Sequence, residues 1–127
     1  MTPLTAEWVE KAEEDWHTLE WLVQSPRGFP AAVGFHAQQC VEKYLKARLH
    51  EAGITFPKTH DLEGLAELLR SGEPAIAACM DQLAFLSRFA VEVRYPGIVP
   101  SDDEAAEARQ ACTALRSRLR KSLGLSP

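Results

Sequence analysis

Apolar residues recur every three or four positions along most of this chain, which is the spacing of an amphipathic helix. The pattern predicts helices from Pro3 or Thr5 to Gln24, from Pro30 to Gly53, over 61–72, from Pro74 to Arg94, and from Ser101 to Gly124. No segment alternates apolar and polar residues as a half-buried strand would. The expected fold class is therefore all-α, an up-and-down antiparallel bundle of four long helices plus one short helix.

Several helix ends carry local signals. The last helix has the clearest start, because Ser101 and Glu104 have the spacing of a capping box. The fourth helix is expected to end at Arg94, since Pro96 disfavours a helical conformation at Tyr95. The cap of the short helix is expected at one of three consecutive residues, Thr59, His60 or Asp61.

The length of 127 residues suits a single domain over 1–127, and no linker divides it. No apolar run approaches the roughly 20 residues that cross a bilayer. The N-terminal stretch MTPLTAEWVEKAEEDW lacks the basic-then-apolar order of a signal peptide. We therefore expect a cytoplasmic protein that makes no contact with a membrane.

Charge and cysteine content exclude several classes of protein. A net charge of −4 argues against bulk nucleic-acid binding through counterion release, so any contact with RNA or a nucleotide has to be local. The cysteines are widely spaced and form no Cys-x-x-Cys pair, so we interpret each as a small buried apolar residue: Cys40, Cys79 and Cys112. His36 and His50 lie too far apart along one helix to share an ion, and neither a metal nor a cofactor is predicted.

The second helix carries an ordered set of polar residues opposite its apolar face. His36, Gln39, Lys43 and Lys46 fall on one narrow line, with Glu42 beside them. The line is either ordinary solvated surface or the lining of a binding site.

Two charged residues interrupt apolar stripes. Asp15 lies within the core-facing stripe of the first helix, and Arg94 ends the core-facing stripe of the fourth. A buried charge is costly unless it is paired. Either these residues pair with each other or with Lys43 and hold the bundle in register, or Arg94 lies beside Tyr95 at the mouth of a cleft and holds a phosphate.

The fourth helix is apolar on two sides, which suggests that one side is buried against another chain. A homodimer is the commonest such assembly. The residues assigned to its interface are Phe85, Leu86, Phe89 and Val93. Trp21, on the polar side of the first helix, is either a further partner contact or a partly covered surface residue.

The segments FHAQQCVEKYLKARL, PKTHDL and RYPG, in this order before a capped last helix, resemble the HEPN family, named for higher eukaryotes and prokaryotes nucleotide-binding. The resemblance covers about Glu7 to Leu119. It implies a helical bundle that is commonly dimeric and is often encoded in bacteria beside a minimal nucleotidyltransferase. Many members are metal-independent RNases or toxins, and others bind nucleotides without cleavage. The residues that match its motifs are Gln39, Glu42, Lys43, Lys46, Lys58, His60, Asp61, Arg94, Tyr95 and Pro96.

One departure from the family pattern bears on activity. RNase members carry an Arg, a spacer of four to six residues and a His, but the positions so spaced from Arg94 hold Val99, Pro100 and Ser101. No histidine follows His60, so the expected proton-transfer group is missing.

These observations favour a non-catalytic subunit that binds a nucleotide or a protein partner, acting with a minimal nucleotidyltransferase in a two-component, toxin–antitoxin-like system. In this interpretation the motif residues and Asp15 form the ligand site. One alternative is a metal-independent RNase with a rearranged site, in which His60 is the base and Arg94 stabilises the phosphate charge. A purely structural, dimerising scaffold is the third possibility.

Overall fold

The computed structural model describes the backbone of residues 1–127 and every side chain except that of Arg94. Its elements are α1 (Pro3–Leu22), α2 (Pro30–Glu51), α3 (Leu62–Glu67), α4 (Pro74–Ala77), α5 (Met80–Ser87), the 3-10 helix η1 (Glu92–Arg94) and α6 (Asp102–Ser122). The described backbone contains no strand, which confirms the predicted all-helical fold. No helix in the described part of the chain has the length and apolar content needed to cross a bilayer.

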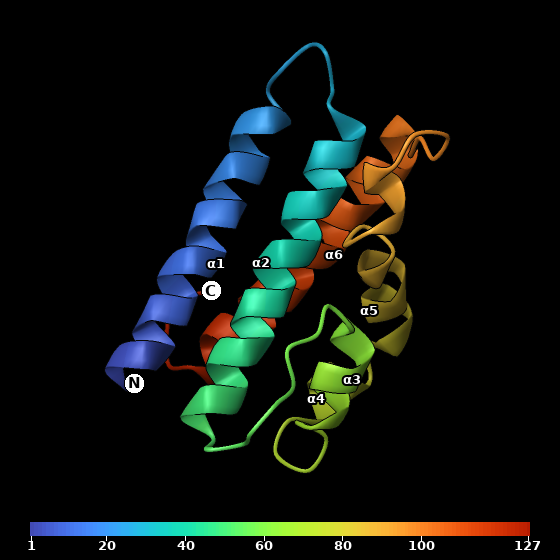
Figure 1. Ribbon diagram of the computed structural model, residues 1–127. Coiled ribbons are helices and arrows are strands. Elements are labelled where there is room, and N and C mark those ends of the chain that lie inside the picture. The colour runs from blue at the N-terminus through green and yellow to red at the C-terminus, as the bar shows by residue number, and fades with distance from the viewer.

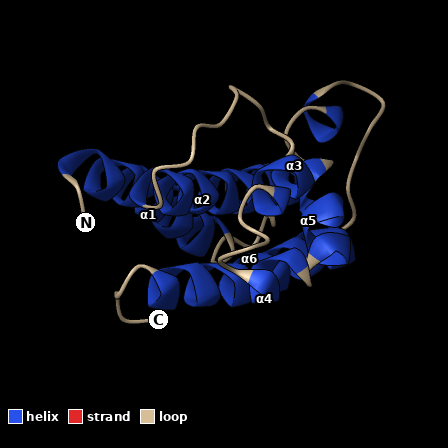
Figure 2. Cartoon of the chain, turned by 90° about the horizontal axis from the view of Figure 1, so that it is seen from below, coloured by secondary structure: helices blue, strands red, loops and turns tan.

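The helix α2 forms the centre of the molecule. It packs between α1 on one side and α6 on another, while α3 and α5 cover a further side (Figure 1). From below, α1 and α2 form a layer, and α6 lies on one side of this layer and runs along it (Figure 2). Because α2 is covered on several sides, buried positions run around most of its circumference, including polar ones such as Gln38, Glu42 and Lys46.

The predicted helix starts are confirmed where a side chain caps the helix. Ser101 Oγ accepts the Glu104 N–H at 3.1 Å, and Glu104 Oε1 accepts the Ser101 N–H at 3.0 Å, completing the capping box of α6. Asp61 caps α3, since its Oδ1 accepts the Gly64 N–H at 3.1 Å. These caps depend on residues three apart, which explains why sequence could locate them.

The predicted continuous helix from Pro74 to Arg94 is wrong, because the structure divides this segment into α4, α5 and η1. The backbone leaves the helical region at Cys79 and Val91. Ser87, the last residue of α5, anchors the chain to α3. Its hydroxyl accepts a hydrogen bond from the Leu62 N–H and donates one to Glu63 Oε1. The short piece α4 packs against α3, α5 packs against α2, α3 and α6, and η1 packs against α2, so tertiary contacts override the local helical pattern.

The burial of residues in this segment also contradicts the predicted dimer interface. Leu86, Phe89 and Val93 are buried in the core of a single chain, which leaves them no surface to offer a second copy. Phe85 is half-buried and packs edge-on against Phe89. The segment from Pro74 to Arg94 is thus apolar on two sides because other parts of the same chain enclose it. Trp21 remains 76% exposed, and its role in a partner contact stays a prediction.

Two of the three cysteines are buried as predicted, and all three are free thiols. Cys40 on α2 and Cys112 on α6 lie in the core, whereas Cys79 is partly exposed. The adjacent Cys112 thiol and the surrounding burial raise the pKa of Cys40 well above its ordinary value. Cys40 therefore stays a neutral thiol, and both core cysteines act as small packing residues.

Candidate functional site

The polar line of α2 is largely covered by other parts of the chain. Glu42 is only 4% exposed and Lys46 only 7%, so the interpretation of these two residues as solvated surface is wrong. Trp8 of α1 lies against Lys46, and His60 of the segment that connects α2 to α3 bonds Glu42. Long side chains of this kind stay buried only when their charges are matched.

The segment between α2 and α3 is held against both long helices. Phe56 packs edge-on against Trp8 of α1, with ring centroids 6.3 Å apart. The Lys46 ammonium lies 5.7 Å from the Trp8 ring centroid, within range of a cation–π interaction. Farther along, the His60 carbonyl accepts a hydrogen bond from Gln38 Nε2 at 3.4 Å. The segment thereby closes over the Glu42 side of α2.

Glu42 is the centre of a buried polar cluster. Its Oε1 bonds Gln38 Nε2 at 3.0 Å and His60 Nδ1 at 2.8 Å, and its Oε2 accepts from Lys46 Nζ at 3.1 Å. Gln39 Nε2 donates to Gln38 Oε1 at 2.7 Å and extends the cluster toward the surface. All buried side-chain nitrogen and oxygen atoms that the structure describes have hydrogen-bond partners. Such a fully bonded cluster fixes the orientation of each member.

Asp15 forms a second cluster on the α1 side of α2. Its carboxylate bonds His36 Nδ1 at 2.8 Å and Lys43 Nζ at 2.6 Å. Asp15 is buried, so its predicted inward orientation and its pairing with Lys43 are confirmed. The side chain of Arg94 lies outside the described residues, and its predicted inward orientation stays a prediction.

The family model of the HEPN domain matches residues 5–122, nearly the whole chain. The chain belongs to the HEPN family. Neither the curated proteins nor the solved structures contain a match to it.

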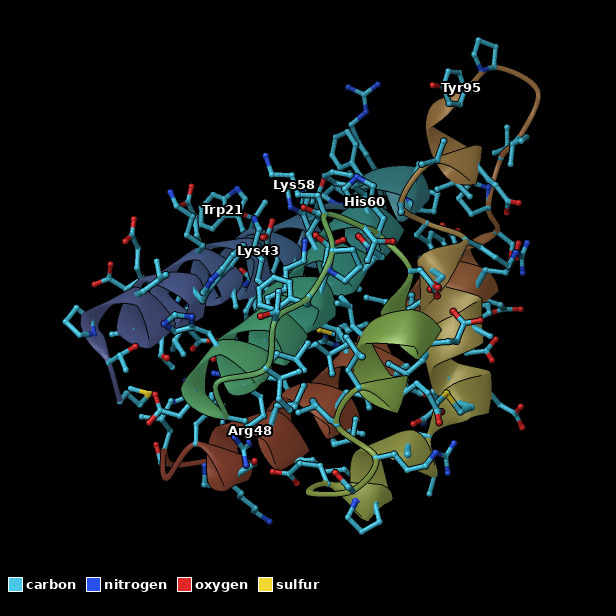
Figure 3. The ribbon with its side chains drawn as sticks, turned by 60° about the horizontal axis from the view of Figure 1, so that its bottom comes forward. Trp21, Lys43, Arg48, Lys58, His60 and Tyr95 are labelled. Atoms are coloured by element: carbon cyan, nitrogen blue, oxygen red, sulfur yellow. The ribbon has the colours of Figure 1, made fainter. Side chains whose placement is uncertain are left out.

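The outer edge of the Glu42 and Asp15 clusters in this HEPN domain is polar. Several of its side chains are partly exposed, although their inward-facing atoms are already hydrogen-bonded within the protein. The His60 side chain is 61% exposed although Glu42 holds its Nδ1. Lys43 and His36 are partly exposed beside Asp15. Lys58 is exposed, and it joins no ion pair with any side chain that the structure describes (Figure 3). This edge combines hydrogen-bonding groups with one unmatched cation.

Other motif residues have different positions. Asp61 serves as the α3 cap rather than as part of either cluster. Tyr95 is exposed on the segment between η1 and α6 (Figure 3), and no contact among the described side chains joins it to Glu42 or Asp15. Nor do the described residues contain a group of three His, Cys, Asp or Glu side chains arranged to hold a metal ion.

Sequence reasoning missed Gln38, which bridges Glu42, Gln39 and the His60 carbonyl. It is fully buried, and it lies next to Ala37 on the side of α2 that the pattern assigned to the core. Its spacing of four residues before Glu42 was the available signal, since residues so spaced are neighbours on a helix.

A separate polar cluster joins α1, α2 and α6. Arg116 bonds both carboxylate oxygens of Glu13, at 2.6 and 2.8 Å, and Tyr44 OH donates to Glu13 at 2.6 Å. Burial opposes ionisation of Glu13, but hydrogen bonds from Arg116 and Tyr44 outweigh it and lower the pKa of Glu13 below its ordinary value. This cluster clamps three helices, and its two guanidiniums, those of Arg116 and Arg120, share the single carboxylate of Glu13.

Proposed function

We propose that this HEPN domain is a cytoplasmic, non-catalytic subunit that binds a nucleotide and acts with a minimal nucleotidyltransferase in a two-component, toxin–antitoxin-like system. The observation that carries the nucleotide part is an exposed His60 ring, held by buried Glu42, near the unmatched Lys58. The family match supports nucleotide recognition. The nucleotidyltransferase and toxin–antitoxin parts rest on the family resemblance.

Among the motif lysines, some are paired with a buried carboxylate and one is not. Asp15 matches the charge of Lys43, and Glu42 matches that of Lys46, so these lysines hold the site in shape. Lys58 is free to approach a phosphate, and the exposed edge of the His60 ring can donate its Nε2–H to a phosphate oxygen when both ring nitrogens carry a proton. Arg94 would add a bidentate phosphate contact, and Tyr95 a stacking surface for the base.

Substitution of Lys58 or His60 should weaken nucleotide binding. Because a hydrogen bond to a charged group contributes about 1.5–3 kcal/mol, Lys58→Ala and His60→Ala should each raise the Kd for ATP at least about tenfold. Isothermal titration calorimetry of the whole chain measures this effect. The matched control is Arg70→Ala, which removes an exposed cation in the turn after α3, paired with Glu67.

The outcome can contradict the proposed site directly. Unchanged affinity in both site variants would show that ATP binds elsewhere. Absence of ATP binding to the wild-type chain would remove the nucleotide proposal and leave RNA cleavage and the structural scaffold as the remaining interpretations. Circular dichroism of each variant separates loss of binding from loss of fold.

A second candidate function, metal-independent RNA cleavage, is favoured by the Glu42–His60 geometry. A buried carboxylate 2.8 Å from Nδ1 holds the proton on that nitrogen and leaves Nε2 as an acceptor on an exposed ring. His60 could then take the proton of a ribose 2′-hydroxyl as its oxygen attacks the adjacent phosphorus. The 5′-oxygen leaves with a proton from water, producing a 2′,3′-cyclic phosphate.

Incubation of the purified chain with single-stranded RNA in EDTA distinguishes the two candidates. Our primary proposal predicts intact RNA on a denaturing gel. Cleavage that persists in EDTA and disappears in His60→Ala would instead assign the RNase function to the Glu42–His60 pair. Cleavage retained in His60→Ala would indicate a contaminating nuclease or another base.

A further inference from the structure

The hydrogen bonds around Glu42 fix the orientation of the Gln38 amide. Gln38 Nε2 lies 3.0 Å from Glu42 Oε1 and 3.4 Å from the His60 carbonyl oxygen. A carboxylate oxygen and a carbonyl oxygen only accept hydrogen bonds, so both N–H groups of the Gln38 amide are used here. The opposite orientation would bring Gln38 Oε1 against two acceptors at a fully buried position. Gln38 Oε1 is therefore left to face Gln39.

The fixed Gln38 amide in turn sets the orientation of the Gln39 amide. Gln38 Oε1 only accepts, and Gln39 Nε2 donates to it at 2.7 Å. Gln39 Oε1 has no partner among the atoms that the structure describes, and no described side-chain oxygen is both buried and unbonded. Gln39 Oε1 therefore reaches solvent. Turning this amide over would bring two oxygens together and break the bond to Gln38, so Gln39 is held with an acceptor facing outward.

Gln39 lies next to the groups that we propose to hold the phosphate. The Gln39 amide and the His60 backbone bond to opposite ends of the same Gln38 amide, so a ligand that reaches the exposed His60 ring is close to Gln39. Phosphate oxygens are acceptors, so they gain nothing from the Gln39 oxygen. The part of a nucleotide that meets Gln39 Oε1 has to be a hydrogen-bond donor.

Nucleobases differ in the donor that they can offer to such an oxygen. Adenine and cytosine carry an exocyclic amino group, whereas hypoxanthine and uracil carry a carbonyl oxygen at the corresponding position. A freely rotating glutamine can meet either group, since its amide has an oxygen on one side and a nitrogen on the other. Gln39 can offer only its oxygen at this position as long as its bond to Gln38 is kept. The fixed amide therefore favours amino bases.

We propose that Gln39 recognises the base of the bound nucleotide by accepting a hydrogen bond from the exocyclic amino group of adenine or cytosine. Gln38 is the positioning residue that keeps the Gln39 oxygen outward. The inference rests on the proposed nucleotide-binding function and adds the class of base: amino bases are preferred to their oxo counterparts.

Calorimetric titration of the whole chain with matched nucleotides tests this preference. The wild-type chain should bind ATP at least about fivefold more tightly than inosine triphosphate, and CTP more tightly than UTP to a similar degree. Gln39→Leu keeps the size of the side chain but removes the acceptor, so the affinity for ATP should fall to that for inosine triphosphate. 2′-Deoxy-ATP should bind as tightly as ATP, because the amino group and not the ribose hydroxyl meets Gln39.

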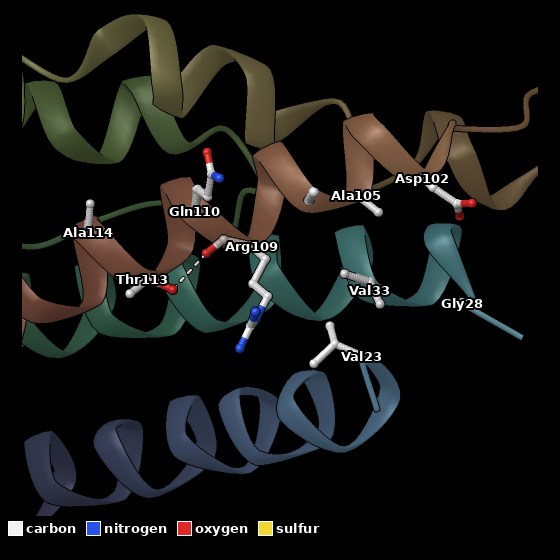
Figure 4. Close-up of a pocket in the computed structure, with 10 residues that line it drawn as sticks. Val23, Gly28, Val33, Asp102, Ala105, Arg109, Gln110, Thr113 and Ala114 are labelled. Carbon is white, nitrogen blue, oxygen red and sulfur yellow. Dashed lines mark hydrogen bonds between the residues drawn. The ribbon is translucent and has the colours of Figure 1, made fainter. Parts of the chain in front are cut away.

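The matched control is Gln110→Leu. Gln110 is an exposed glutamine of α6 in the lining of a hollow of about 540 Å³, where α6 meets the end of α1 and the start of α2 (Figure 4). It takes no part in the Glu42 cluster. The substitution should leave the affinities for ATP and inosine triphosphate unchanged. A loss of the ATP preference in Gln110→Leu would place the base in that hollow and overturn the proposal.

Gln38→Met tests the positioning role. Without the Gln38 oxygen, Gln39 can turn over and donate to an oxo base, so the affinity for inosine triphosphate should approach that for ATP. A purely structural role of Gln38 would weaken both ligands equally. Circular dichroism checks that the variant folds; if it does not, the wild-type and Gln39→Leu titrations decide alone.

The failure of this inference differs from the failure of the proposed function. Equal affinities for ATP and inosine triphosphate in the wild-type chain would overturn base recognition by Gln39 and leave nucleotide binding in place. A wild-type loss of affinity for 2′-deoxy-ATP that disappears in Gln39→Leu would assign Gln39 to the ribose instead, which also overturns the inference. Absence of binding by all of these nucleotides would overturn the proposed function itself, and the inference with it.

Discussion

Replacement of Glu42 with alanine is expected to lower the free energy of unfolding by about 3–5 kcal/mol, because it leaves a buried charge without its partner. Lys46 is 7% exposed, and its ammonium donates to Glu42 Oε2 at 3.1 Å. Gln38 and His60 lose their bonds to Oε1 in the same substitution. Urea denaturation of the wild-type and variant chains measures the difference.

An exposed ion pair provides the control for this experiment. Glu67, the last residue of α3, pairs with Arg70 in the following turn at 2.7 Å, but more than half of each side chain is exposed. Glu67→Ala should therefore change the free energy of unfolding very little. The double variant Glu42→Met with Lys46→Met should recover much of the lost stability, since it buries no unmatched charge. An equal cost for Glu42→Ala and Glu67→Ala would contradict the role assigned to the buried cluster.

The second large effect is expected at Gly34, where α2 and the segment after α5 make their closest approach. A Cβ at this position would lie 2.0 Å from Phe89 Cδ1. The Phe89 ring is fully buried, so it has no room to withdraw. Gly34→Ala should therefore destabilise the fold by about 1–3 kcal/mol through overpacking, although alanine is the better helix former. Thermal unfolding followed by circular dichroism detects a loss of this size.

A second glycine separates the steric effect from the general effect of adding a methyl group. A Cβ at Gly72 would meet nothing within 4 Å, so Gly72→Ala should leave stability nearly unchanged. Combining Gly34→Ala with Phe89→Leu should restore part of the loss, because the smaller side chain makes room for the new methyl group. If Gly34→Ala is as stable as Gly72→Ala, the close packing of Phe89 on α2 is not a constraint on this fold.

Local signals were sufficient for much of the architecture. The apolar periodicity located α1, α2 and α6, and residue spacing located the capping box of Ser101 and Glu104. These features depend on neighbours within about one helical turn. The same periodicity failed between Pro74 and Arg94, where Ser87 bonds to α3 and Phe89 packs on Gly34. Such contacts join residues distant in the chain and leave no mark on local spacing.

In the candidate site, too, local spacing predicted some features and tertiary contacts set the others. Helical spacing placed Gln39, Lys43 and Lys46 on one line, and the position of Asp15 in an apolar stripe correctly indicated a buried, paired carboxylate. Spacing could not show that the segment after α2 covers Glu42 or that His60, 18 residues away, would bond to it. The burial of this cluster depends on how one connecting segment lies across two helices.

By itself, the sequence determined the helical class, the three long helices, the caps and the inward carboxylate of Asp15, because each follows from side-chain spacing on a single helix. Only the tertiary structure decided which cations are matched, which apolar residues remain for a partner, and where the helix after Pro74 breaks. The physical reason is that burial and charge pairing depend on distances between segments far apart in the chain. Those distances exist only once the helices are packed.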